Sequence, residues 1–135
     1  MKTLTVKADI ANLGKVLSFI DSELEKTDCG IKTGMQINIA VEELFVNVAH
    51  YAYPPGTGDV TIGIEIYDDP GMVEITFTDT GIPYDPLSKD DPDVTLSAED
   101  RRIGGLGIYM VKKSMDLMKY ERTDGHNIVT ISKYF

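Results

Sequence analysis

Residues 60–81 read VTIGIEIYDDPGMVEITFTDTG, and this stretch decides the fold class of the chain. Strict alternation of apolar side chains is typical of a strand with one buried face. The turn residues DDPG at 68–71 join the two alternating runs and predict an antiparallel hairpin, which needs a second layer to cover its apolar face. The alternating positions are Val60, Ile62, Ile64, Ile66, Val73, Ile75 and Phe77.

The sequence on either side of this hairpin supplies the second layer. Strands and helices do not alternate along the chain as they do in a doubly wound fold. We therefore predict an α+β fold, a two-layer sandwich with helices on one face of a mostly antiparallel sheet. The elements expected outside the hairpin are a strand around Leu4 and Val6, a helix over about 10–26, a helix capped by Thr33 that runs to about Tyr51 or Tyr53, a helix after Gly107, and two strands joined by Asp124-Gly125.

Length and composition are those of one globular domain, over residues 1–135. The formal net charge of −9 excludes a large basic surface, so we expect no direct contact with nucleic acid and no membrane binding. No stretch approaches the ~20 apolar residues of a membrane span. A single cysteine, Cys29, cannot form an internal disulfide, and we expect a cytoplasmic protein.

Glu43 and Asn47 lie four residues apart on the second predicted helix, so both side chains face the same way. The amide oxygen of Asn47 suits Mg²⁺, which takes few protein ligands, and Glu43 could then accept a proton from an attacking hydroxyl. The alternative is an ordinary solvent-exposed polar helix face.

The segment Asp79-Thr80-Gly81 ends the second strand of the hairpin. A carboxylate at Asp79 can accept hydrogen from the amino group of adenine, and Gly81 allows the backbone to approach a flat base closely. Thr80 could add a hydrogen bond or a bridging water. The alternative is a simple turn, because Asp and Gly are common turn residues.

A glycine-rich run, Gly104-Gly105-Leu106-Gly107, opens the third predicted helix. Converging backbone N–H groups at a helix start favour anions, so this run predicts a phosphate cradle. The alternative is a flexible hinge. The pattern matches neither the P-loop nor the Rossmann fingerprint.

The order of these three motifs resembles the ATPase superfamily of gyrase, histidine kinases, mismatch-repair ATPases and heat-shock chaperones. Within it, VEELFVNVAHYAYP at 41–54, DTGIPYDPL at 79–87 and IGGLGIYMVKKSMDLMKYERTDGHNIVTISK at 103–133 resemble the anti-sigma-factor serine/threonine kinase family. The resemblance covers nearly the whole chain, from the first predicted strand to the last.

This resemblance implies roles for individual residues. Glu43 would be the general base, Asn47 the Mg²⁺ ligand, and Asp79 and Gly81 the adenine contacts. Gly105 and Gly107 would line the triphosphate and residues 83–103 would form the ATP lid. Family members that bind a sigma factor often have an arginine where this chain has Ile103, and Arg101 or Arg102 could replace it.

His50 lies seven residues after Glu43, on roughly the same face of the predicted helix, so it could touch a phosphate or the lid. The alternative is a local hydrogen bond at the helix end.

The resemblance implies an ATP-dependent kinase that transfers the γ-phosphoryl group to a serine or threonine of a partner protein. The partner would be a sigma factor, an anti-sigma antagonist, or both, and a homodimer is left open. The first alternative is a nucleotide-gated binding module without turnover. A second is an ATPase module of a larger complex, which the lack of a transducer domain in these residues disfavours.

Overall fold

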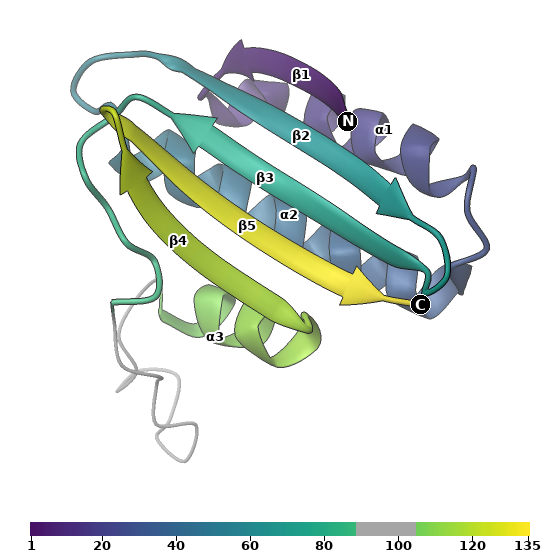
Figure 1. Cartoon of the computed structure of the whole chain (residues 1–135). Helices are drawn as coiled ribbons and strands as arrows, with labels where there is room; N and C mark the ends of the chain where they lie inside the picture. Colours follow the sequence, from purple (N-terminus) through teal and green to yellow (C-terminus); the bar gives the residue numbers. More distant parts are fainter. Residues whose placement is uncertain (89–104) are drawn as a thin grey trace.

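We describe a computed structural model of the chain, in which residues 1–88 and 105–135 are described. Five strands form one sheet in the order β1-β2-β3-β5-β4, and each neighbouring pair is antiparallel. The helices lie together on one face of this sheet (Figure 1). The predicted α+β two-layer sandwich is therefore confirmed. The strands are β1 (Lys2–Lys7), β2 (Asp59–Tyr67), β3 (Met72–Asp79), β4 (Leu117–Thr123) and β5 (His126–Tyr134), and the helices are η1 (Ile10–Asn12), α1 (Leu13–Leu24), α2 (Gly30–Tyr51) and α3 (Gly105–Ser114).

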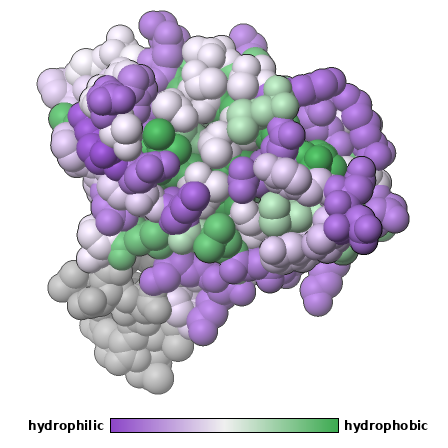
Figure 2. Space-filling model, in the orientation of Figure 1, coloured by the Kyte–Doolittle hydropathy of each residue, from purple (hydrophilic) through white to green (hydrophobic). Residues whose placement is uncertain are grey.

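The predicted hairpin forms as β2 and β3, with Ile62 opposite Phe77 and Ile64 opposite Ile75. These inward side chains are buried against the helices, because alternation places all of them on one face of the sheet. Figure 2 views the opposite, outward face, where hydrophilic, neutral and apolar side chains are mixed.

The central helix α2 supplies most of the helical side of the core. Its buried residues recur at helical spacing and pack between the sheet and the flanking helices α1 and α3. Phe45 of α2 and Phe77 of β3 are the largest fully buried side chains. The buried stripe of α2 consists of Ile37, Ala40, Val41, Leu44, Phe45 and Val48.

Two local expectations have different outcomes. The predicted start of the second helix at Thr33 is wrong, because α2 begins at Gly30. Gly30 has a φ of 85°, a left-handed conformation that favours glycine and that lets the chain turn sharply from α1 into α2. The predicted Asp124–Gly125 turn is confirmed, with both residues at positive φ between β4 and β5.

In the described ranges 1–88 and 105–135, no helix has the length and apolar character needed to cross a membrane.

Candidate functional site

The glycine-rich start of α3 meets the middle of α2 at Glu43. A methyl group built on Gly107 would overlap the Glu43 carboxylate, so this glycine leaves the space that the carboxylate fills. Asn47 lies one turn further along α2, on the same side of the helix as Glu43. The fold therefore joins two sequence motifs that lie far apart along the chain.

The side-chain amide of Asn47 is incompletely paired. Its Nδ2 atom is buried and has no hydrogen-bond partner among the described residues. A buried, unpaired N–H donor of this kind often marks a place where an acceptor, such as a water oxygen or an oxygen of a ligand, completes the site. With Nδ2 turned inward, the amide oxygen is the atom that Asn47 offers outward.

Asp79 ends β3 and is buried, with 6% of its surface exposed. Its Oδ1 atom accepts a hydrogen bond from the Gly81 backbone N–H at 2.9 Å and another from Asn127 Nδ2 at 2.9 Å. Across the described part of the chain, no group donates to Oδ2. One carboxylate oxygen is thus fixed by the protein, and the other is free to accept from a ligand.

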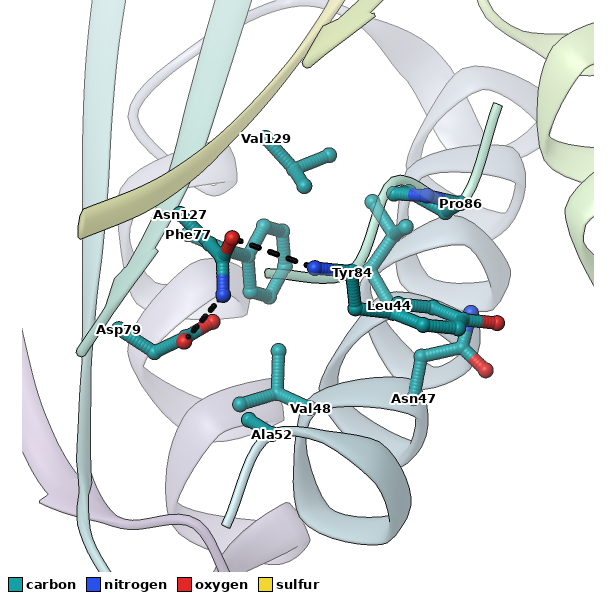
Figure 3. Close-up of a pocket in the computed structure, with 10 residues that line it drawn as sticks. All are labelled: Leu44, Asn47, Val48, Ala52, Phe77, Asp79, Tyr84, Pro86, Asn127 and Val129. Carbon is teal, nitrogen blue, oxygen red and sulfur yellow. Dashed lines mark hydrogen bonds between the residues drawn. The ribbon is translucent and has the colours of Figure 1, made fainter. Parts of the chain in front are cut away.

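A mostly apolar pocket lies between β3, β5 and α2. Figure 3 shows Asp79 on one side of this pocket and Asn47 on the other, with apolar side chains between them. Such a lining suits a flat apolar ring that carries a hydrogen-bond donor at one edge. The lining residues are Leu44, Asn47, Val48, Ala52, Phe77, Asp79, Tyr84, Pro86, Asn127 and Val129.

Tyr84 forms one wall of the pocket, from the segment that follows β3. Its ring stacks on that of Tyr51 near the end of α2, with 5.0 Å between the centroids and 16° between the planes. This stack ties the segment after β3 to the helix that carries Asn47.

The structure does not bring two of the predicted nucleotide contacts to this pocket. Thr80 is exposed and turned toward Tyr53, whose hydroxyl accepts from the Thr80 N–H at 2.9 Å and lies 3.2 Å from its Oγ1. His50 is also exposed and lines a separate groove with Tyr53 and Ile10. The His50 ring lies edge-on to that of Tyr51, with 6.1 Å between the centroids, and its contact with a phosphate or the lid stays a prediction.

Gly81 lies next to the pocket, but its missing side chain points elsewhere. A methyl group at this position would overlap the carbonyl oxygen of Ala52 at the end of α2. The Ile82 N–H donates to the same carbonyl at 2.9 Å. Gly81 therefore permits the β3 end to pack closely against α2.

The glycine run is only partly described. Gly105 opens α3 and Gly107 contacts Glu43, whereas Leu106 is described by its helical backbone alone. Gly104 lies outside the described residues, as do residues 89–103 of the predicted lid, including Arg101, Arg102 and Ile103.

Sequence reasoning missed three polar residues of β4 and β5 that hold the end of β3. Asn127 bonds Asp79, the Tyr120 hydroxyl donates to Asn127 Oδ1 at 2.5 Å, and Arg122 donates to the Gly81 carbonyl at 2.8 Å. One signal was available in the sequence, since Asn127 is a polar residue two positions after Gly125 of the predicted Asp124-Gly125 turn. The sequence did not show that β5 pairs with β3, and this pairing places Asn127 opposite Asp79.

Comparison with known proteins places these motifs in a family. Residues 6–133 match the family described as the histidine kinase-like ATPase domain. The chain belongs to this family. The matched residues include every strand and helix described above, except for the first residues of β1 and the last residue of β5.

Relatives of this ATPase domain include bacterial protein kinases. The serine/threonine-protein kinase BtrW of Bordetella bronchiseptica is 26% identical over 98 residues, which cover 73% of this chain and 68% of the relative. The serine-protein kinase RsbW of Listeria monocytogenes is 31% identical over 103 residues, covering 73% of this chain and 64% of the relative. The match thus spans about two thirds of the length of these relatives.

Solved structures share the fold of the domain. The RsbU and RsbW domains of Rv1364c from Mycobacterium tuberculosis align with a TM-score of 0.65 at 15% identity, over 98% of this chain and 32% of that one. The histidine kinase domain of the blue-light activated histidine kinase from Erythrobacter litoralis EL346 aligns with a TM-score of 0.58 at 18% identity, over 92% of this chain and 59% of that one.

Proposed function

We propose that this chain binds ATP in the pocket between Asp79 and Asn47 and transfers the γ-phosphoryl group to a serine or threonine of a regulatory partner protein. The observation that carries this proposal is the arrangement of polar groups around one apolar pocket. A buried carboxylate with one free oxygen lies on one side, and the Glu43–Asn47 face of α2 lies on the other.

Adenine would occupy the apolar part of the pocket, with its amino group donating to Asp79 Oδ2. Phe77, Val48 and Val129 supply apolar surface for the ring. The phosphates would then extend toward Asn47 and the start of α3. Gly105 and Gly107 lie in the first turn of this ten-residue helix, where backbone N–H groups are free to bind anions.

Mg²⁺ fits the donor set on this side of the pocket. Asn47 lines this side of the pocket and has an amide oxygen, and Mg²⁺ is usually held by one or two protein ligands together with substrate phosphates. Asn47 would hold the ion, and when bound the ion would neutralise charge on the phosphates.

Glu43 would act as the general base. In the transfer, the partner hydroxyl oxygen forms a bond to the γ-phosphorus, the bond from that phosphorus to the bridging oxygen breaks, and ADP leaves. The hydroxyl proton passes to the Glu43 carboxylate. The contact between Glu43 and Gly107 supports this role, because it holds the carboxylate beside the expected phosphate site.

The names of the relatives support a protein substrate. BtrW and RsbW are named as serine/threonine- or serine-protein kinases. By analogy, the partner of this chain would be a sigma factor, an anti-sigma antagonist, or both, in the cytoplasm. A homodimer stays a prediction.

The binding half of the proposal is tested by calorimetry with ADP, with and without Mg²⁺. Asp79→Asn can keep both hydrogen bonds to Oδ1 while it replaces the free acceptor with an NH₂ donor, so the fold should hold. Adenine would then face a mismatched donor, which costs about 1–3 kcal/mol and weakens ADP binding roughly 5–150-fold. Asp124→Asn, in the exposed β4–β5 turn, is the matched control and should bind as the wild type does.

Asn47→Ala tests the metal assignment in the same assay. It should remove most of the difference between ADP affinity with and without Mg²⁺, while the affinity without Mg²⁺ stays close to that of the wild type. Equal Mg²⁺ dependence in both proteins would contradict the assignment.

The catalytic half is tested by incubating the chain with γ-labelled ATP and a candidate antagonist protein, followed by mass spectrometry of the phosphorylated residue. Phosphoserine or phosphothreonine on the partner supports the kinase. Stable complex formation that depends on ATP but gives no transfer would favour the nucleotide-gated binding module.

A further inference from the structure

The buried amide of Asn127 lines the pocket and has no role in the proposed binding and transfer steps. It is 3% exposed and lies opposite Asp79 in the pairing of β3 with β5. Its Nδ2 atom donates to Asp79 Oδ1 at 2.9 Å and to the Ile82 carbonyl at 2.8 Å. Its Oδ1 atom accepts from the Tyr84 N–H at 3.4 Å and from the Tyr120 hydroxyl at 2.5 Å.

These partners fix the orientation of the amide. The nitrogen faces two acceptors, a carboxylate and a carbonyl, whereas the oxygen faces a backbone N–H, which can only donate. A flipped amide would place oxygen against the Asp79 carboxylate and nitrogen against the Tyr84 N–H. The Tyr120 hydroxyl must therefore donate to Asn127, and the donors form one directed chain from Tyr120 through Asn127 to Asp79 (Figure 3 shows the Asn127–Asp79 step).

The chain of donors decides what Asp79 offers to a ligand. Oδ1 is saturated by Asn127 Nδ2 and by the Gly81 N–H, which holds the plane of the carboxylate in place. Oδ2 is then left as an acceptor aimed at the ligand. An acceptor binds the 6-amino group of adenine and opposes the 6-oxo group of hypoxanthine or guanine, because two buried acceptors would face one another.

We infer that Asn127, locked by the Tyr120 hydroxyl, is a positioning residue that makes the pocket select 6-amino over 6-oxo purine nucleotides. This inference rests on the proposed binding of a nucleotide at Asp79. Asn127 acts through Asp79 and need not touch the base.

Arg122 provides an internal comparison. It also ties β4 to the end of β3, but it bonds the Gly81 carbonyl and leaves the Asp79 carboxylate untouched. A general loosening of this turn should therefore weaken all nucleotides alike, whereas loss of the Asn127 amide should act on base selection.

The experiment compares the dissociation constants of ADP and inosine diphosphate, which differ at the purine 6-position, by calorimetry with Mg²⁺. The wild type should prefer ADP by roughly 5–150-fold, the cost of one buried mismatch. Asn127→Leu should bring this ratio close to one, mainly through weaker ADP binding. Tyr120→Phe removes one of the two donors to Asn127 Oδ1, so the amide is held less firmly and the ratio should fall by about 2–12-fold, the value of one net hydrogen bond. Arg122→Met is the control and should leave the ratio unchanged.

A thermal melt of each variant separates positioning from folding. If Asn127→Leu does not fold, Tyr120→Phe decides the question, since it removes one hydroxyl. An unchanged ratio in the folded variants, or no base preference in the wild type, overturns the inference. Wild-type protein that binds neither nucleotide refutes the proposed function itself, whereas ADP preference that survives in the variants refutes the positioning role alone.

Discussion

The substitution Gly81→Ala distinguishes two reasons for a glycine beside the pocket. If Gly81 is needed to leave room for the adenine base, the variant should keep its stability and lose nucleotide affinity. If Gly81 is needed for close packing against the end of α2, the variant should lose stability. The structure supports the second reason, because the new methyl group would overlap the Ala52 carbonyl oxygen and lie 2.6 Å from its carbonyl carbon and 2.7 Å from its Cβ.

The size of the effect follows from what can move. The clashing atoms are mainly the backbone of Ala52, the residue that caps the end of α2; a backbone cannot rotate away as a flexible side chain can, and overpacking of this kind costs about 1–3 kcal/mol. Separation of the two segments would also weaken the Ile82–Ala52 hydrogen bond, worth about 0.5–1.5 kcal/mol. We expect a loss of about 2–4 kcal/mol, which lowers the Tm of a domain of this size by about 6–20 °C.

The assay is urea unfolding and a thermal melt, with ADP calorimetry below the Tm. Gly34→Ala is the matched control, because Gly34 lies inside α2 and a methyl group there meets nothing within 4 Å. That variant should gain about 0.5–1 kcal/mol from the higher helix propensity of alanine. A Gly81→Ala protein with wild-type stability and no ADP binding would refute the packing argument and restore the base-approach role.

Three further outcomes follow from the same geometry. Glu43→Gln keeps the shape of the side chain and removes the base, so phosphotransfer should fall by about 10²–10⁴-fold while ADP affinity measured by calorimetry stays nearly constant. Gly107→Ala should displace the flexible Glu43 carboxylate; the Tm should stay within a few degrees of the wild type while phosphotransfer drops, and an active variant would show that this contact is dispensable. Phe45→Ala should destabilise the domain by about 3–5 kcal/mol in urea unfolding, because it empties a fully buried site in the core.

The sequence was sufficient for the two-layer architecture and for the pairing of β2 with β3. The alternation around Ile62 and Phe77 and the helical stripe through Leu44 each repeat with the period of their own element, and local periodicity is what a sequence displays directly. The start of α2 was predicted wrongly because Thr33 is a residue type that often caps helices, whereas the chain turns into α2 at Gly30, which has a left-handed backbone conformation.

The sequence points to Glu43, Asn47 and Asp79 as candidates because of their positions: Glu43 and Asn47 lie one helical turn apart, and Asp79 lies at the end of a strand. Their roles as base, metal ligand and adenine contact stay predictions. Thr80 and His50 were grouped with them by proximity along the chain, yet their side chains face Tyr53 and a separate groove. The direction of a side chain at a turn or a helix end depends on which elements pack against it, and sequence spacing does not specify that.

The sequence by itself thus determined the class of fold, the family resemblance and the position of the main motifs, because these depend on local period and residue type. Only the tertiary structure decided that Gly81 packs on Ala52, that Glu43 fills the space left by Gly107, and that Asn127 lies opposite Asp79. Each of these contacts joins segments that are distant along the chain, and their geometry is fixed by the order of strands in the sheet and the close packing of helices on it.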